Sequence, residues 1–590
     1  MLIRAMAGSF HLLLLGLHVL LLPSEPSASD APVLYACDSQ VFCQGDLLQT
    51  VQMAKLFNDS KTFVDMRMVH DANKTREAFK ALGDKPTREQ IKGFVEGFFQ
   101  PPGHDLENWE PEDWKENPGF IDKINDSDLK TFGRILNSLW KKLGRNISAE
   151  ARENINRSSL IVVDKPFIVP GGRFREFYYW DTYWTVKGLL VCEMSNTVRN
   201  MIDNFVQLVR EIGFIPNGGR IYYKNRSQPP FLIPIVDLYL DYTKDFDYVK
   251  SILGDLEAEY DFWQKSRQVK VSKGGETWTL NRYLANMNTP RPESYYEDVH
   301  TAQSLPVSRK PPLFQDLASA AESGWDFSSR WFGKNSTDLK GTMTQSKVPV
   351  DLNAVLYRNE KTLERLFTKA GNLVKAEKYK ELAKKRAHAM EMVFWNEGKG
   401  SWLDFDLNSN SSNPDFHAST FAPMWAGLHQ GNVTRDLLLM TTLRDKLVLS
   451  HQGGIPTTLK KTGQQWDYPN AWPPLQDIAI DAMADSKSEE VKRSAFILAQ
   501  KWVNTNYKAW KATGHMFEKF NADIQGAPGG GGEYDIQVGF GWSNGVALQI
   551  LQTYGAELSV RPGKPSTASC PGHAITWSLI MLSCLKMLLN

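Results

Sequence analysis

Cysteine is scarce in this 590-residue chain, and the common metal-binding motifs are missing from it. The five cysteines form no CxxC pair, which excludes a zinc ribbon and a thioredoxin-type redox motif. The eleven histidines form neither HExxH nor any other paired spacing. We therefore expect the protein to work without a metal ion, and no motif indicates any other cofactor.

Charge of one sign and low-complexity sequence are also lacking. The 68 Lys and Arg against 67 Asp and Glu give a net charge of +1, which argues against a nucleic-acid binder because such proteins need a basic excess. Disorder is excluded by 42% hydrophobic and 11% aromatic residues. No linker, charge block or break in aromatic density interrupts the interior of the chain, so we predict a single domain over residues 29–560.

Residues 1–28 have the pattern of a secretory signal peptide. Arg4 precedes the Leu-rich stretch Phe10–Leu22, and small residues around Ala28 offer a cleavage site. The alternative is a buried first helix. A signal peptide predicts an oxidising compartment, in which Cys37 and Cys43 could form a small disulfide loop and leave Cys192 free and buried.

The C-terminal end resembles a glycolipid (GPI) attachment signal. A polar stem, residues 561–566, leads to small residues and then to the apolar run Ala574–Leu589, which is shorter than the roughly 20 residues that span a bilayer. We predict attachment at Ser566, with Ala568 as the alternative, and removal of residues 567–590. The competing interpretation is a transmembrane tail. The mature protein is expected on the extracellular face of the plasma membrane.

N-x-S/T sequons support the secretory route. Glycosylation is predicted at Asn58, Asn73, Asn125, Asn146, Asn156, Asn335, Asn410 and Asn432. A ninth sequon, at Asn225, overlaps a candidate binding motif, so we predict that Asn225 is unmodified.

Helical periodicity dominates the interior of the chain. The stripe from Met201 to Ile212 ends at Gly213, a plausible helix terminator. Similar stripes occur within residues 352–367, 379–394, 437–449, 491–503 and 546–554. Helix pairs without a fixed repeat length favour a closed α/α toroid over a solenoid, with functional loops at one mouth.

Three loop segments concentrate Trp, Tyr, Gly, Arg and carboxylates: residues 170–184, 465–474 and 529–542. Indole rings can cover the apolar face of a pyranose while charged groups bond its hydroxyls, so these segments favour a sugar site. The alternative is that the tryptophans are core residues, and that Asp181 and Asp467 are structural acceptors at helix starts. Gly529–Gly532 fits neither a Walker A motif nor a dinucleotide fingerprint, and a mobile lid is more plausible.

These segments carry a close resemblance to the two signature motifs of trehalases, inverting glycosidases that split α,α-trehalose into two glucoses. The resemblance covers residues 40–555 and is closest to the GPI-anchored animal members; Tyr468 and Ala471 are small departures within the second motif. It implies an all-α (α/α)6 toroid. It also implies that Asp326 is the general acid and Glu518 the general base. The implied substrate contacts are Arg173, Trp180, Asp181, Asn217, Arg226, Ser227, Gln228, Arg291, Pro292, Glu293, Gly324 and Glu533.

The implied chemistry sets requirements for these groups. Inverting hydrolysis needs two carboxyl groups about 6.5–9.5 Å apart, with the acid protonated by burial or by a neighbouring carboxylate and the base ionised. Arg173, Arg226 and Arg291 could fork to sugar hydroxyls. Without the resemblance, Glu518 beside Lys519 would be interpreted as a solvated ion pair. Inversion predicts one β-glucose and one α-glucose.

Two rival functions remain open. One is another inverting α-glucosidase on the same toroid, acting on maltose or starch ends. The other is a cell-surface sugar-binding protein without catalysis, which would be expected to lack Asp326 or Glu518. The sequence leaves the oligomeric state open, with a homo-oligomer as one alternative.

Overall fold

The computed structural model describes residues 32–428 and 431–560. The predicted signal peptide and the predicted attachment site with its tail lie outside the described residues. Within these ranges, no helix combines the length and apolarity that a membrane span requires.

The helices pack as two rings, one inside the other. The inner ring consists of α7 (Asp181–Val191), α9 (Leu232–Thr243), α14 (Val350–Lys369), α16 (Ala422–Trp425), α18 (Pro473–Ala484) and α20 (Gly541–Tyr554). Each inner helix packs on the next, and α20 closes the ring against α7. The outer ring consists of α5 (Ser127–Leu143), α8 (Ser195–Ile212), α11 (Leu253–Ser266), α15 (Leu373–Phe394), α17 (Val433–Asp445) and α19 (Glu489–Thr513). The prediction of an all-α (α/α)6 toroid is confirmed.

The two rings differ in how their helices are buried. Helix α7 is buried on all sides from Asp181 to Leu190, as expected for a helix with neighbours all round. Helix α8 in contrast buries one stripe, including Met201, Phe205 and Val209, and ends at the predicted Gly213 with φ 89°. The predicted stripes within 352–367 and 546–554 belong to the inner helices α14 and α20, and the other stripes belong to the outer helices α8, α15, α17 and α19. The completely buried α7 carries no such stripe.

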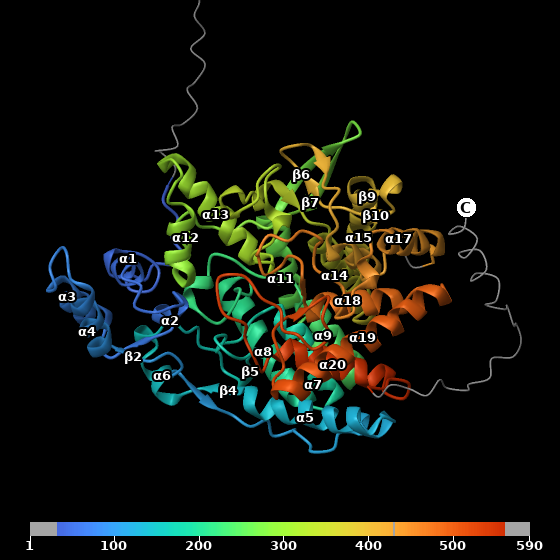
Figure 1. Ribbon diagram of the computed structural model, residues 1–590, viewed down its shortest axis with the longest axis horizontal. Coiled ribbons are helices and arrows are strands. Elements are labelled where there is room, and N and C mark those ends of the chain that lie inside the picture. The colour runs from blue at the N-terminus through green and yellow to red at the C-terminus, as the bar shows by residue number, and fades with distance from the viewer. Residues whose placement is uncertain (1–31, 429–430, 561–590) are drawn as a thin grey trace, which may run out of the picture.

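Ring closure depends on glycine. A Cβ atom on Gly545 of α20 would lie 2.0 Å from the carbonyl oxygen of Trp184, and one on Gly188 of α7 would lie 2.6 Å from the Cα of Gly545. Neither position can carry a side chain, because the two backbones touch here. Figure 1 shows this junction, with the red α20 beside the green α7.

An N-terminal lobe lies beside the rings, shown in blue in Figure 1. It contains α1 (Asp46–Met53), α2 (Lys61–Val64), α3 (Ala72–Lys80) and α4 (Arg88–Phe98), with β1 (Arg67–Met68) paired to β2 (Phe99–Gln100). The lobe has its own hydrophobic cluster, which includes Phe63, Phe94 and Phe99. The predicted disulfide between Cys37 and Cys43 is present at its start, and Cys192 is free and buried.

Short elements connect the rings. The longest hairpin pairs β6 (Gln268–Lys273) with β7 (Glu276–Asn281) across a turn in which Gly274 and Gly275 both have positive φ. The other strands are β3 (Leu106–Asn108), β4 (Gly144–Ile147), β5 (Phe167–Ile168), β8 (Lys347–Val348), β9 (Trp395–Asn396), β10 (Ser401–Trp402), β11 (Phe405–Asp406), β12 (Ser411–Ser412), β13 (Asn470–Ala471) and β14 (Phe520–Asn521). The other α-helices are α6 (Ala149–Glu153), α10 (Phe246–Ser251), α12 (Tyr295–Thr301) and α13 (Lys310–Glu322).

Candidate active site

A cavity lies among the loops that lead into the inner helices. The three aromatic segments meet here, together with the loop that follows α13. The predicted residues that line the cavity are Arg173, Trp180, Asp181, Asn217, Arg226, Gln228, Arg291, Glu293, Gly324, Asp326, Glu518 and Glu533. Segments more than 300 residues apart in sequence therefore form one site.

Two of the predicted substrate contacts do not line the cavity. The backbone N–H of Ser227 donates to Glu322 Oε1 at 2.9 Å, and its hydroxyl donates to the carbonyl of Ile215. The carbonyl of Pro292 accepts from Gln52 Nε2 at 2.8 Å. Both residues therefore hold the walls of the site in place.

Asp326 is a buried carboxyl group in the cavity lining whose pKa the surroundings raise. Burial raises its pKa from 3.8 to about 7; Arg291 opposes the shift and Glu533 adds to it. The turn before Asp326 needs Gly324, which has φ 76° and whose Cβ would lie 2.6 Å from the indole of Trp180. Asp326 is thus held as a neutral acid near pH 7 against an aromatic wall.

Glu518 is buried and receives two donors. The ammonium of Lys519 bonds its Oε2 at 2.9 Å, and the hydroxyl of Tyr534 bonds its Oε1 at 2.8 Å. The ion pair with Lys519 exists, but the alternative of a solvated pair is wrong, because both side chains are almost fully buried.

Asp181 is a third carboxyl group in the cavity, at the start of α7. Burial raises its pKa well above the usual range, and the nearby Glu518 and Asp326 add to the shift. Burial also raises the pKa of Glu533. Both shifts favour the protonated form of these groups, which can donate as well as accept hydrogen bonds.

Each of the three predicted arginines already holds a carboxylate. Arg226 Nη2 bonds Glu293 Oε1 at 2.6 Å, and its Nε bonds Asn217. Arg291 forks to Asp298 and also reaches Glu533. Fewer donors are thus left for a ligand than three free guanidinium groups would supply. Within the described residues, Arg226 Nη1 and Glu293 Oε2 have no partner.

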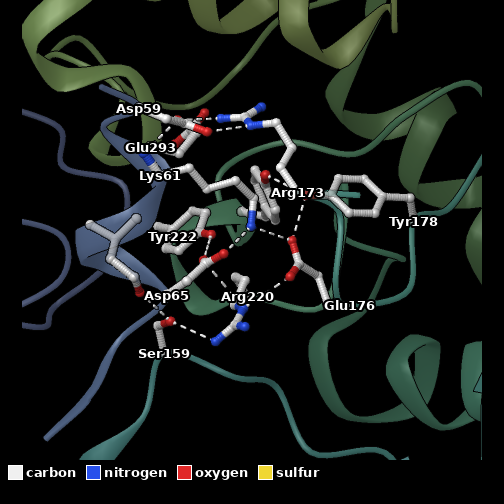
Figure 2. A network of polar contacts seen from close by, with 12 residues as sticks. Asp59, Lys61, Asp65, Ser159, Arg173, Glu176, Tyr178, Arg220, Tyr222 and Glu293 are labelled. Carbon is white, nitrogen blue, oxygen red and sulfur yellow. Dashed lines mark hydrogen bonds and ion pairs between the residues drawn. The ribbon is translucent and has the colours of Figure 1, made fainter. Parts of the chain in front are cut away.

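The side chain of Arg173 is held by a residue of the N-terminal lobe, outside the two rings. Its guanidinium forks to Asp59 of the N-terminal lobe at 2.6 and 2.7 Å and lies 4.4 Å from the centre of the Tyr534 ring. Figure 2 shows Asp59 directly against Arg173. Nothing in the sequence marked Asp59, because a lone acidic residue in a separate segment carries no signal.

A buried charge network fixes the lobe to the loop before α7 (Figure 2). Lys61 of α2 bonds Asp65 at 2.5 Å and Glu176 at 2.7 Å, and Arg220 reaches both carboxylates. Glu176 also accepts from the hydroxyl of Tyr178, which lines the cavity. The segment from Arg173 to Tyr178 is thereby anchored at both ends.

Tryptophan side chains form one wall of the cavity. Trp466 and Trp472 stack with ring centres 3.8 Å apart and planes 3° apart, and Trp180 and Trp542 complete the wall. The interpretation that these tryptophans serve the site rather than only the core agrees with this placement. Trp325 stacks behind Trp466, at 5.5 Å, and does not line the cavity.

Asp467, in contrast, is a structural acceptor as the alternative proposed, but it lies in the loop before α18 and not at a helix start. It is fully buried outside the cavity and accepts from Ser328, Ser329, Thr458 and Thr462. These bonds tie the segment after Asp326 to the loop before α18. Asp467 and Asp181 could not be told apart from sequence alone, since each follows a tryptophan.

The glycine-rich loop passes over the cavity. The side-chain N–H of Asn470 donates to the carbonyl of Gly530 at 2.7 Å, and its Oδ1 accepts from the N–H of Gly530 at 2.9 Å. The N–H of Gly532 donates to the carbonyl of Gly463. Glu533 and Tyr534 then project into the cavity lining. A Cβ on Gly531 would lie 2.3 Å from the carbonyl oxygen of Gly463, so the glycines permit close packing here.

Two lining residues lie outside every segment singled out in the sequence. Tyr223 stacks its ring 4.9 Å from the Arg226 guanidinium, and Ser294 donates to Glu533 Oε2 at 3.2 Å. Both lie close in sequence to a predicted substrate contact, Arg226 or Glu293, and this closeness is the signal that could have identified them. In the part of the chain described, no three or more His, Cys, Asp or Glu are arranged to hold a metal ion.

A double ring of helices encloses carboxyl groups, guanidinium groups and tryptophans in one pocket, so the fold and the site define an α/α toroid with the residue types of a carbohydrate site.

Comparison with known proteins identifies the family. The trehalase family model matches residues 55–555. The trehalase of Oryctolagus cuniculus is 46% identical over 550 residues, 92% of this chain and 95% of that protein. The trehalase of Apis mellifera is 45% identical over 533 residues, 89% of this chain and 85% of that protein. The solved structure of neutral trehalase Nth1 from Saccharomyces cerevisiae shares the fold, with a TM-score of 0.54 and 21% identity over 70% of this chain and 82% of its own. The chain belongs to the trehalase family.

Proposed function

We propose that this protein hydrolyses α,α-trehalose to two glucoses with inversion at the attacked carbon, Asp326 acting as general acid and Glu518 as general base. The observation that carries the proposal is the opposite environment of two carboxyl groups lining one cavity. Burial raises the pKa of Asp326 to about 7, while Glu518 receives an ammonium and a hydroxyl donor.

The reaction proceeds in one displacement. Asp326 donates its proton to the glycosidic oxygen as the bond to the anomeric carbon breaks. Glu518 takes a proton from a water molecule, whose oxygen attacks that carbon from the opposite face. The attacked sugar leaves as β-glucose and the other as α-glucose. Arg226 Nη1 and Glu293 Oε2, which lack partners within the described residues, are available to sugar hydroxyls.

The pocket matches an uncharged disaccharide. Its tryptophan wall offers apolar surface for the C–H face of a pyranose, and the neutral acids and paired arginines offer donors and acceptors for hydroxyls. We extend the substrate contacts to Asp181, Asn217, Gln228, Arg291 and Glu533, which line the same cavity. The protein needs no cofactor for this chemistry.

Product analysis by NMR tests the mechanism. Freshly formed glucose from trehalose is expected as equal amounts of the α and β anomers, and two α anomers would contradict inversion.

Asp326→Asn and Glu518→Gln are each expected to lose at least about 10³-fold in kcat. The matched control is Glu259→Gln, another buried carboxyl group whose pKa is raised to about 7 but which contacts Tyr179 and Trp263 outside the cavity. It is expected to keep turnover.

Comparison of substrates separates the rival enzyme. Glucose release from trehalose but not from maltose is expected, and equal rates would favour the broader α-glucosidase. A binding protein without catalysis would bind trehalose and release no glucose.

We also propose that the protein is secreted and GPI-anchored, with residues 1–28 and 567–590 removed, Ser566 attached and 29–560 forming one catalytic domain. The Cys37–Cys43 disulfide and the similarity of this chain to animal trehalases support a secretory route through an oxidising compartment. Of the predicted glycosylation sites, Asn146 is half-buried and the other seven are exposed. The exposed sites are Asn58, Asn73, Asn125, Asn156, Asn335, Asn410 and Asn432. A GPI-specific phospholipase is expected to release activity from membranes, and complete retention would favour a transmembrane tail.

A further inference from the structure

Two polar side chains lie directly behind the candidate acid and base without lining the cavity. Gln465 and Lys519 are 2% and 0% exposed, and neither belongs to the cavity wall. A buried, uncompensated ammonium would be unfavourable, so Lys519 must be held by specific partners.

The partners of Gln465 and Lys519 form one continuous chain of contacts. Gln465 Nε2 donates to the backbone carbonyl of Asp326 at 2.5 Å. Its Oε1 accepts from Lys519 Nζ at 3.1 Å, and Lys519 Nζ donates to Glu518 Oε2 at 2.9 Å. Gln465 also reaches the hydroxyl of Tyr534, which donates to the other oxygen of Glu518. Two side chains therefore connect the segment of the acid to the carboxylate of the base.

The backbone holds this chain in register. Strand β13 pairs with β14, so that Ala471 lies opposite Phe520, and Gln465 and Lys519 lie just before these strands. Lys519 Nζ lies 5.0 Å from the centre of the Trp472 ring and 5.4 Å from that of Tyr534. A Cβ on Gly529 would lie 3.0 Å from Lys519 Cγ, so the glycine loop also confines the lysine stem.

We propose that Gln465 and Lys519 are positioning residues for hydrolysis: Lys519 keeps Glu518 ionised and aimed into the cavity, and Gln465 fixes the separation of the acid and base segments. The inference rests on the proposed roles of Asp326 and Glu518. Neither Gln465 nor Lys519 touches the substrate, so both act on kcat through another residue.

The sign of the pH effect follows from the groups around Glu518. Lys519 is the cation in contact with it, Tyr534 is a neutral donor, and Asp181 and Asp326 are buried carboxyl groups nearby. Removing the ammonium takes away the positive charge in contact with Glu518 and leaves the buried carboxyl group of Asp181 nearby, so protonation of Glu518 is expected to extend to higher pH in the variant. Because the base must be ionised, the acid limb of the kcat profile then moves to higher pH.

The experiment measures kcat and KM across pH for Lys519→Met and Lys519→Arg. The acid limb of Lys519→Met is expected to move up by about 1–2 pH units, while the alkaline limb of Asp326 and KM change little. Lys519→Arg keeps the charge and is expected to keep the position of the acid limb. The matched control is Lys187→Met, a buried lysine paired with Asp477 and Asp481 outside the cavity, which should leave the limb in place.

Gln465→Met provides an independent test. It is expected to lower kcat about 10- to 100-fold at every pH with KM nearly unchanged, because the acid and base lose their fixed separation. This variant decides the matter if Lys519→Met does not fold. Unchanged kcat in Gln465→Met, or an unmoved acid limb in folded Lys519→Met, overturns the inference. Retained activity in Glu518→Gln would instead overturn the proposed function.

Discussion

Asp326→Asn should abolish hydrolysis and at the same time stabilise the folded protein above pH 7. The wild-type carboxyl group has a pKa of about 7 in the folded state against 3.8 for an ordinary aspartate. Between these values the folded protein binds a proton that the unfolded chain does not, so the free energy of unfolding falls as pH rises through this window. Asparagine does not titrate and avoids this loss.

The magnitude follows from the shift. About three pKa units correspond to about 4 kcal/mol at 1.36 kcal/mol per unit. The full difference is expected above pH 7 and none below about pH 4, where both states are protonated. With an unfolding entropy of about 2.1 cal/mol/K per residue, a chain of this size gains about 3 °C in Tm.

Thermal unfolding of wild type and Asp326→Asn at the same scan rate, from pH 4 to 8, measures the difference. The Tm of the variant is expected to rise above that of wild type as pH increases. Asp467→Asn is the opposing control. It replaces a buried carboxylate that accepts hydrogen bonds from Ser328, Ser329, Thr458 and Thr462. This variant should be less stable than wild type at neutral pH. A Tm difference for Asp326→Asn that does not depend on pH would refute the reasoning.

Three further outcomes are expected. Gly324→Ala forces a side chain onto the Trp180 indole at a positive φ, so it should lose about 2–4 kcal/mol by denaturant titration together with most activity; a variant with wild-type stability would show that the turn can relax. Asp59→Asn removes the charge that holds Arg173, and KM for trehalose should rise about tenfold with a smaller change in kcat; an unchanged KM would remove Arg173 from binding. Asn225 is buried and donates to the Tyr222 carbonyl, so peptide mapping of active enzyme should find it without glycan, and full occupancy would contradict its burial.

Helices were predictable from the sequence where apolar residues recur with helical spacing. The stripe ending at Gly213 located α8, because burial on one side only produces a period of 3.6 residues. Helix α7 carries no such stripe, since its neighbours surround it. The short pairings of the N-terminal lobe escaped prediction as well, because two-residue strands such as β1 and β2 depend on their tertiary partners.

The residue types of the site could be predicted from the sequence, but the contacts that hold these residues in place could not. Tryptophans, acids and arginines concentrated in loops indicated a sugar pocket, and the family resemblance assigned roles to Asp326 and Glu518. Sequence could not show that Arg173 is paired with Asp59, because that contact joins segments 114 residues apart. Nor could it separate Ser227, which supports the wall, from Arg226, which lines it.

The closure of α20 on α7 has a consequence for how the protein acquires activity. The two helices are joined through Gly188 and Gly545, and the loop that carries Glu518 leads directly into α20. Such distant contacts form late, because a long loop must be closed before they contribute any stability. A chain still emerging from the ribosome is therefore expected to lack the contact of α20 with α7, and with it a fixed position for the proposed base Glu518. Hydrolysis begins only when the last helix is in place, so activity itself reports completion of the fold.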